Sequence, residues 1–145
     1  MTSVTSTTKK GGEPASAGIP VSAAMHRGVL ACGKDASLAY VAELMASHRV
    51  HCVVVTDDPG DAESLWGIVS DLDLAAAASV RDLAEQTAGA TAATVVLTVG
   101  PSETVQRAAQ LMTEHGTTHL VVVDAGRRPV GIISTLDVAA ALGES

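Results

Sequence analysis

The chain has 145 residues, of which 47% are hydrophobic and 17% are charged, and it contains one Trp, one Tyr and no Phe. This length suits one compact domain or two small units that share a core, and it excludes a cofactor domain joined to a separate substrate domain. With a formal net charge of -7 and almost no aromatic rings, the chain lacks the clustered cations and stacking surfaces that nucleic-acid binding uses.

Residues 1–18 are rich in Ser, Thr and Gly and have no apolar periodicity. Such a segment buries too little apolar surface to offset the entropy of ordering, so we expect a flexible tail. The start of the chain has no signal-peptide pattern, and no apolar run approaches the ~20 residues needed to cross a bilayer. We therefore expect a cytoplasmic protein that does not associate with membranes.

The remainder of the chain is an internal repeat, its most informative feature. The corresponding segments are Leu44-Met45 and Leu111-Met112, His51 and His119, and residues 67–70 and 131–134. Length differences between the halves fall where turns are expected, and insertions are tolerated there. We assign residues 19–80 to the first unit and residues 81–143 to the second. Because each unit is small for a core of its own, two stacked units sharing one core are expected.

In the first unit the pattern predicts a strand, a helix, two strands and a short helix. The first helix is predicted from about Ser37 to His48, because apolar residues recur there at intervals of three and four, and Ser37 suits its N-cap. Residues 52–55 form a continuous β-branched run, which indicates a strand covered on both faces.

The second unit repeats this pattern, with a helix over about residues 103–115 and a strand over residues 120–123. Between the units, residues 81–88 are expected to form a single helix that stops at Gly89. The two repeated β-α-β-β-α units predict an α+β fold.

A short motif ends a strand and enters a helix in each unit: Gly-Ile-Val-Ser-Asp-Leu-Asp in the first and Gly-Ile-Ile-Ser-Thr-Leu-Asp in the second. A helix N-terminus offers unpaired N–H groups and positive potential, to which Ser70 or Ser134 adds a hydroxyl and Asp73 or Asp137 an acceptor for a ribose diol. This combination suits a nucleoside with phosphates. The alternative is that Ser caps the helix, Asp complements its dipole, and neither binds a ligand.

Histidine and cysteine residues raise the further possibility of a zinc or redox-responsive site. The residues concerned are His48, His51, His115, His119, Cys32 and Cys52. The first histidine of each pair ends a helix, where it complements the dipole, and the second begins a strand. We therefore predict no metal site, and we expect both cysteines to be small buried residues.

Motifs for catalysis are absent from the sequence. It contains no nucleophile elbow, Walker-type phosphate loop, HExxH motif or paired CxxC motif. The repeated Ser and Asp also have no neighbouring base in a defined arrangement. We therefore expect a protein that is not an enzyme.

The duplicated β-α-β-β-α order, the Gly-h-h-Ser-x-x-Asp endings (h, hydrophobic), the helices with Leu-Met and the Val-Val-Val strands resemble the CBS domain family, specifically a tandem pair, or Bateman module. The resemblance covers about residues 19–143. It implies a compact module with pseudo-two-fold symmetry, two clefts that bind AMP, ADP, ATP or S-adenosylmethionine, and a homodimer packed through its helices.

The resemblance also implies the residues of each cleft. One cleft combines Ser134 and Asp137 with Ala31 and Val50, and the other combines Ser70 and Asp73 with Thr98 and Thr118.

Some residues depart from the family pattern. Ala31 and Val50 stand where the family often has polar side chains, so the cleft of Asp137 loses hydrogen bonds. Asp71 adds negative charge to the other cleft and is expected to weaken the binding of multiply charged phosphates. Arg127 and Arg128 are candidate phosphate contacts if their turn folds towards a cleft, and otherwise belong to a solvated turn.

We therefore expect a stand-alone CBS pair that binds an adenosine-containing ligand as a regulatory signal and acts on a protein partner or on its own oligomeric state. Two alternatives remain at this stage. One is an interaction or stress-associated adaptor with empty clefts, and the other is a zinc- or redox-responsive module.

Overall fold

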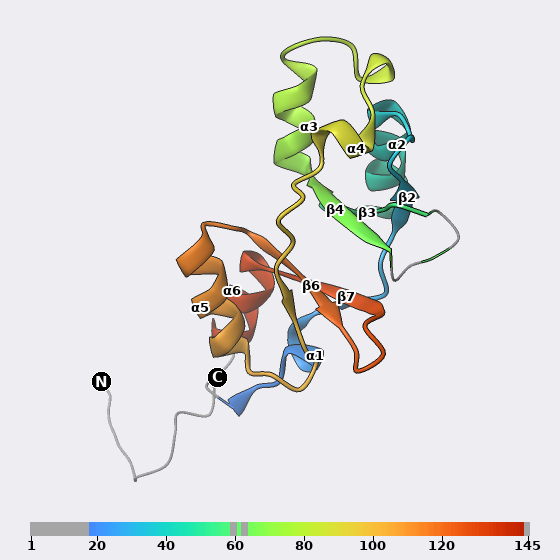
Figure 1. Cartoon of the computed structure of the whole chain (residues 1–145). Coiled ribbons are helices and arrows are strands. Elements are labelled where there is room, and N and C mark those ends of the chain that lie inside the picture. The colour runs from blue at the N-terminus through green and yellow to red at the C-terminus, as the bar shows by residue number, and fades with distance from the viewer. Residues whose placement is uncertain (1–17, 59–60, 62–63, 144–145) are drawn as a thin grey trace, which may run out of the picture.

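The computed structural model describes residues 18–58, 61 and 64–143, so the tail predicted at residues 1–18 lies outside the described residues except for Gly18. The first unit contains β2 (Ala31–Gly33), α2 (Leu38–His48), β3 (Cys52–Thr56), β4 (Leu65–Ser70) and α3 (Asp71–Ala78). The second contains β5 (Thr98–Val99), α5 (Val105–His115), β6 (His119–Val123), β7 (Pro129–Ser134) and α6 (Thr135–Gly143). Both follow the predicted order, which confirms the repeated α+β architecture (Figure 1).

Each unit has its own sheet, with strand order β2-β3-β4 in the first and β1-β7-β6-β5 in the second. In each sheet a parallel pair is followed by an antiparallel pair. The register shifts between Val55 and Thr56 in the first sheet and between Val122 and Val123 in the second. The repeat therefore extends to the irregularities of the strands.

The N-terminal segment packs on the second unit, although it precedes the first in the chain. It comprises α1 (Val21–Ala24) and β1 (His26–Arg27). β1 pairs with β7 in antiparallel fashion, and Val21 is fully buried in the core of the second unit. The residues that precede the first unit in the chain therefore form part of the second unit.

The linker between the units, by contrast, packs on the first unit. It contains a 3-10 helix, η2 (Leu83–Glu85), and a short helix, α4 (Ala88–Thr91). The prediction of one helix over residues 81–88 that stops at Gly89 is wrong. Thr87 is extended, pairs with Ser37 of the first unit and caps α4, which itself contains Gly89. Bonds to the first unit thus override the local helical tendency. The division of the chain at residues 80 and 81 stays a prediction.

Buried residues among those described form one cluster in each unit and a third between the sheets. In β3, Val53 and Val55 face the helices of their own unit, whereas Cys52 and Val54 pack with Val121 of the other sheet. Alternate side chains therefore point to opposite buried faces, as expected for a strand covered on both sides. Figure 1 shows α2 and α3 beside the first sheet and α5 and α6 beside the second.

The two cysteines are free and buried. Cys32 lies opposite Val55 in the parallel pair of β2 and β3, three residues along the strand from Cys52. This offset is about 10 Å, which exceeds the reach of a disulfide. Burial raises the pKa of Cys32, and burial together with the charges of Asp73 and Asp71 raises the pKa of Cys52 to about 12. Both thiols therefore stay protonated near neutral pH.

The helices of the described part are short. The longest, α2 and α5, have 11 residues each. None of the described helices has the length and apolar character required to span a bilayer.

Candidate functional site

The motif of the first unit forms a capping box at the start of α3. The Ser70 hydroxyl accepts a hydrogen bond from the Asp73 N–H at 3.2 Å, and the Asp73 Oδ2 accepts one from the Ser70 N–H at 2.8 Å. Each side chain thus satisfies a backbone donor that the helix leaves unpaired. The box holds the Asp73 carboxylate in place through one of its two oxygens.

The motif of the second unit has the same geometry at the start of α6. The Asp137 N–H donates to the Ser134 hydroxyl at 3.2 Å, and the Ser134 N–H donates to the Asp137 Oδ2 at 2.9 Å. The Ser134 hydroxyl also lies 3.0 Å from the same oxygen. Capping is therefore present in both motifs, and in both it leaves Oδ1 of the aspartate outside the box.

Backbone bonds place the start of one strand beside each motif. The Asp71 N–H donates to the carbonyl of His51 at 3.0 Å, and the Thr135 N–H donates to the carbonyl of Thr118 at 3.0 Å. His51 therefore lies next to the start of α3, as Thr118 lies next to the start of α6, and Val50 precedes His51 in the chain. The correspondence of His51 with His119 predicted from the sequence is wrong, because Cys52 lies opposite Ser70 where His119 lies opposite Ser134.

The remaining predicted residues follow from the strand register. Ala31 lies opposite Val54, and Thr98 lies opposite Val121. The structure thus groups the candidates by unit: Ala31, Val50, Ser70 and Asp73 belong to the first sheet and its helix, and Thr98, Thr118, Ser134 and Asp137 to the second. The two combinations across units stay predictions, because no hydrogen bond between described residues joins the sets.

The two motif regions are linked electrostatically at His119, a half-buried residue at the start of β6. Burial lowers its pKa most, and the charge of His51 lowers it further, against opposing effects of three carboxylates. These belong to Asp71 and Asp73 of the first unit and to Asp137 of the second. The shift keeps the His119 imidazole neutral near pH 7. The starts of α3 and α6 therefore act on one side chain at the boundary between the units.

Asp71 pairs with a histidine of its own unit. Its Oδ2 lies 2.9 Å from the Nδ1 of His51, and its Oδ1 accepts the Leu72 N–H at 2.9 Å. Burial by itself would raise the pKa of Asp71, but these hydrogen bonds and the charges of His51 and His119 lower it overall. The negative charge expected from the sequence is therefore present, with a histidine beside it.

Sequence reasoning missed a residue beside Asp137, His26 of β1. Its Nε2 lies 3.0 Å from the Oδ1 of Asp137. His26 precedes the repeat and meets its partner only because β1 adds to β7, so no local pattern in the sequence signals the contact. By contrast, Asp73 Oδ1 has no hydrogen-bond partner among the residues that the structure describes.

Arg127 and Arg128 lie in the turn between β6 and β7, where the Arg127 N–H donates to the Asp124 carbonyl at 2.9 Å and the Arg128 N–H to the Asp124 carboxylate at 3.0 Å. β7 runs from this turn to Ser134, so the turn lies at the opposite end of the sheet from the motif. The turn therefore does not bring these arginines to the motif of the second unit, and a contact between them and a ligand phosphate stays a prediction.

Within the described ranges, no three His, Cys, Asp or Glu side chains converge as ligands for a metal ion. His48 and His115 instead place Nδ1 at 3.1 and 3.0 Å from carbonyls one turn earlier in their helices. These contacts match the helix-end role expected from the sequence.

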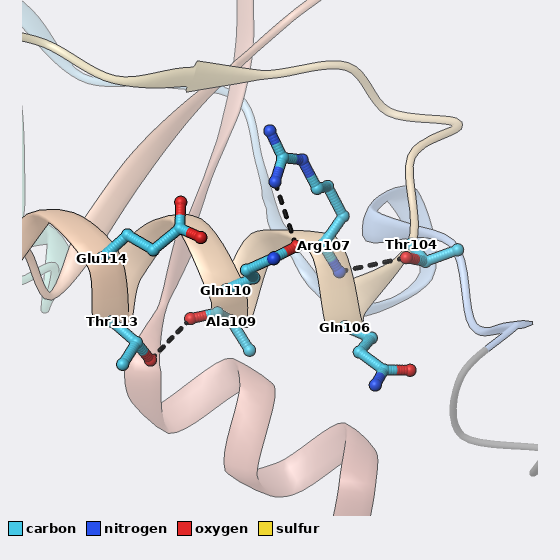
Figure 2. Close-up of a pocket in the computed structure, with 7 residues that line it drawn as sticks. All are labelled: Thr104, Gln106, Arg107, Ala109, Gln110, Thr113 and Glu114. Atoms are coloured by element: carbon cyan, nitrogen blue, oxygen red, sulfur yellow. Dashed lines mark hydrogen bonds between the residues drawn. The ribbon is translucent and has the colours of Figure 1, made fainter.

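Two open hollows lie away from the motifs. One, of about 640 Å³, follows the outer surface of α5 from Thr104 to Glu114 (Figure 2). The other, of about 490 Å³, is lined by residues 98–103 and 123–125. Neither contains Ser70, Asp73, Ser134 or Asp137. Of the predicted residues, Thr98 is the one that lines either of these two hollows.

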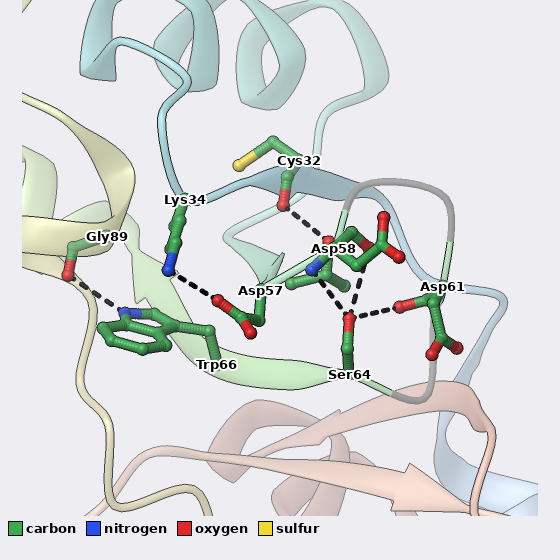
Figure 3. A network of polar contacts seen from close by, with 9 residues as sticks. Cys32, Lys34, Asp57, Asp58, Asp61, Ser64, Trp66 and Gly89 are labelled. Atoms are coloured by element: carbon green, nitrogen blue, oxygen red, sulfur yellow. Dashed lines mark hydrogen bonds and ion pairs between the residues drawn. The ribbon is translucent and has the colours of Figure 1, made fainter.

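A polar network at the far end of the first sheet holds the linker (Figure 3). The Lys34 ammonium lies 2.6 Å from Asp57 and 4.8 Å from the centre of the Trp66 ring. The Trp66 indole N–H donates to the carbonyl of Gly89 at 3.1 Å. These contacts attach α4 to the unit that carries Asp73.

Comparison with known proteins identifies related folds. The family profile of the CBS domain matches residues 21–80 and 91–144. The CBS domain pair of protein MJ0100, solved with 5′-methylthioadenosine and S-adenosylmethionine, is 23% identical, with a TM-score of 0.75 over 86% of this chain and 96% of that one. A CBS-domain-containing protein from Agrobacterium tumefaciens is 26% identical, with a TM-score of 0.74 over 90% of this chain and 98% of that one.

A third structure, CBSX2 in complex with AMP, is 26% identical, with a TM-score of 0.68 over 88% of this chain and 98% of that one. No curated protein sequence matches significantly. Two successive profile matches cover most of the chain, and they fall on the two sheet-and-helix units described above. The chain therefore belongs to the CBS domain family and contains a tandem CBS pair.

Proposed function

We propose that this CBS pair is a regulatory sensor without catalytic activity, which binds an adenosine-containing ligand between its units. The observation that carries the proposal is the pair of aspartates at the starts of α3 and α6, each held by a capping box through Oδ2. A ribose diol needs a carboxylate acceptor in a fixed position, and each box supplies one. The helix N-terminus beside it adds positive potential for a phosphate.

The surrounding residues complete the proposed sites. Thr118 and His51, the residue after Val50, bond to the starts of the helices, and Ala31 and Thr98 lie on the adjacent strands. The charges at His119 connect the two motif regions. We assign ligand contacts to these residues together with Ser70, Asp73, Ser134 and Asp137.

The charge of the sites favours ligands with few negative charges. Asp71 lies at the start of α3, and His51 is the side chain paired with it. We therefore propose AMP or S-adenosylmethionine as better ligands than ADP or ATP. The complex of CBSX2 with AMP supports an adenosine monophosphate, whereas the resemblance to the MJ0100 pair supports the fold.

We also propose that the pair forms a homodimer and that ligand binding is reported through it or through a protein partner. Leu72 and Leu136 occupy equivalent positions on α3 and α6 and are 73% and 72% exposed. Each leucine precedes a proposed ligand aspartate in the chain, so the residues proposed to contact the ligand and those proposed to contact the partner lie within one helical turn. A ligand shifts such an equilibrium by its differential affinity for the two arrangements.

Sedimentation velocity tests the homodimer. Leu72→Glu with Leu136→Glu is expected to convert a dimer into a monomer, because the charges oppose apolar burial. Val95→Glu, at a side chain 83% exposed in the linker, is the matched control and is expected to leave the dimer intact. A monomeric wild-type chain contradicts this part of the proposal.

Titration calorimetry tests the ligand. AMP, ADP, ATP and S-adenosylmethionine are titrated into the full chain after it has been shown to be free of co-purified nucleotide. Asp73→Asn or Asp137→Asn keeps an oxygen for the cap but removes the charge, and is expected to weaken AMP binding at its site about tenfold or more. Asp35→Asn, at an exposed position away from the motifs, serves as the control. Absence of heat with all four compounds would overturn the ligand proposal and favour an adaptor.

A further inference from the structure

The two proposed aspartates differ in one contact. Asp137 Oδ1 lies 3.0 Å from the Nε2 of His26, and its other oxygen is engaged in the capping box. The Asp137 side chain is only 10% exposed, whereas that of His26 is 78% exposed. The imidazole therefore lies on the solvent side of a largely buried carboxylate.

Pseudo-symmetry identifies the counterpart of His26 in the first unit. His26 lies opposite Ile132 in the second sheet, and Ala93 forms an isolated bridge with Ile68 at the corresponding place in the first. The backbone approaches match as well: a Cβ added at Gly131 would lie 2.5 Å from the His26 carbonyl oxygen, and one added at Gly67 would lie 2.5 Å from that of Ala93.

Ala93 has a methyl group in the place of an imidazole, so it has no side-chain donor for Asp73. Asp73 Oδ1 accordingly has no hydrogen-bond partner among the described residues, and it is available to a ribose hydroxyl. The difference between the sites therefore comes from residues outside the repeated motif, one in the N-terminal segment and one in the linker.

We propose that His26 competes with the ligand for Asp137 and makes the second site the weaker of the two, so that the chain binds its adenosine ligand first at Asp73. The inference rests on the proposed function. A ribose hydroxyl that takes Oδ1 of Asp137 must displace the imidazole, and no such displacement is needed at Asp73. Because the His26 ring is largely exposed, the competition weakens binding without abolishing it.

Exchange of the two counterpart residues tests the inference, with AMP as the probe and the full chain in every titration. His26→Ala is expected to tighten AMP binding by about threefold to tenfold at the site that Asp137→Asn weakens. Ala93→His is expected to weaken AMP binding by a similar factor at the site that Asp73→Asn weakens. His26→Gln keeps an N–H near the position of Nε2 and is expected to resemble the wild type.

Arg27→Ala is the matched control, because Arg27 is the neighbouring exposed residue of β1. Equal tightening by Arg27→Ala and His26→Ala would overturn the inference, since loosening of β1 would then explain both. AMP binding that depends on Asp73 but is unchanged in His26→Ala and Ala93→His would overturn the inference and leave the proposed function intact. Absence of AMP binding in the wild type and in every variant would overturn both.

Discussion

Two residues of this CBS pair, His119 and Asp71, are expected to change its folding stability in separate pH ranges. In the folded chain the pKa of His119 is lowered, chiefly by burial, from its ordinary value of 6.5. The unfolded chain therefore binds this proton first as the pH falls. His119 contributes stability that is present above pH 6.5 and is lost as the pH falls through its folded pKa. The pKa of Asp71 is lowered from 3.8, so its contribution is lost only in stronger acid.

His119→Gln is expected to reduce the loss of folding free energy between about pH 7 and about pH 5 by on the order of 1 kcal/mol or less, because glutamine does not titrate. Urea unfolding followed by circular dichroism at both pH values measures the difference. His48→Gln, on the exposed end of α2, is the control. Equal acid sensitivity of the wild type and His119→Gln would contradict the prediction.

At the scale of elements, side-chain caps determine where the helices begin. Ser37 caps α2 by accepting the Tyr40 N–H at 3.1 Å, as predicted from its position before an apolar period. α5 begins at Val105 instead of the predicted residue 103, because Thr104 is extended and caps the helix. The N–H of Val105, the next residue, donates to the carbonyl of Ile19 in the N-terminal segment at 2.8 Å. Neither the Thr104 cap nor this long-range bond was predicted from the sequence.

Ser37→Ala is expected to lower the free energy of unfolding by about 1 kcal/mol, because the N–H of Tyr40 loses its acceptor. Ser37→Asp keeps an acceptor and is expected to remain close to the wild type. Urea unfolding at neutral pH compares the three proteins. Equal losses in both variants would show that packing at residue 37, and not the cap, stabilises α2.

For the whole molecule, the central feature is the exchange of segments between the units. β1 adds to the sheet of the second unit, and the linker bonds to the first through Ala93 and Ile68. Both crossings pass a glycine of the repeated motif, Gly131 or Gly67, at a distance that leaves no room for a side chain. The Gly that begins each motif is thus required by the backbone of the exchanged segment.

Gly67→Ala and Gly131→Ala are each expected to cost about 1–3 kcal/mol of folding free energy, because the new methyl group displaces backbone. Hydrogen exchange is expected to increase at Ala93 in the first variant and at Gly28 in the second. The Ala93 N–H donates to the carbonyl of Ile68, and the Gly28 N–H donates to the carbonyl of Val130. Gly143→Ala, with no atom within 4 Å of the added methyl, is the control. Wild-type stability of both motif variants would contradict the close approach.

Much of the candidate site was predictable because its signals are local. The spacing of Ser70 and Asp73 within three residues specifies a capping box, and the same spacing recurs at Ser134 and Asp137. Pairing of His51 with Asp71 was not anticipated, because it depends on the pairing of β3 with β4. The His26 contact was out of reach, because it joins residues 26 and 137.

The sequence by itself determined the duplicated unit, the order of its elements, the buried strands and the position of each aspartate at a helix start. Those features follow from apolar period, β-branched runs and caps, which act over a few residues. Only the tertiary structure decided the path of the linker, the exchange of β1 and the partner of Asp137. These depend on contacts between distant residues, whose free energy comes from packing and backbone pairing in the folded chain and has no counterpart in local propensity.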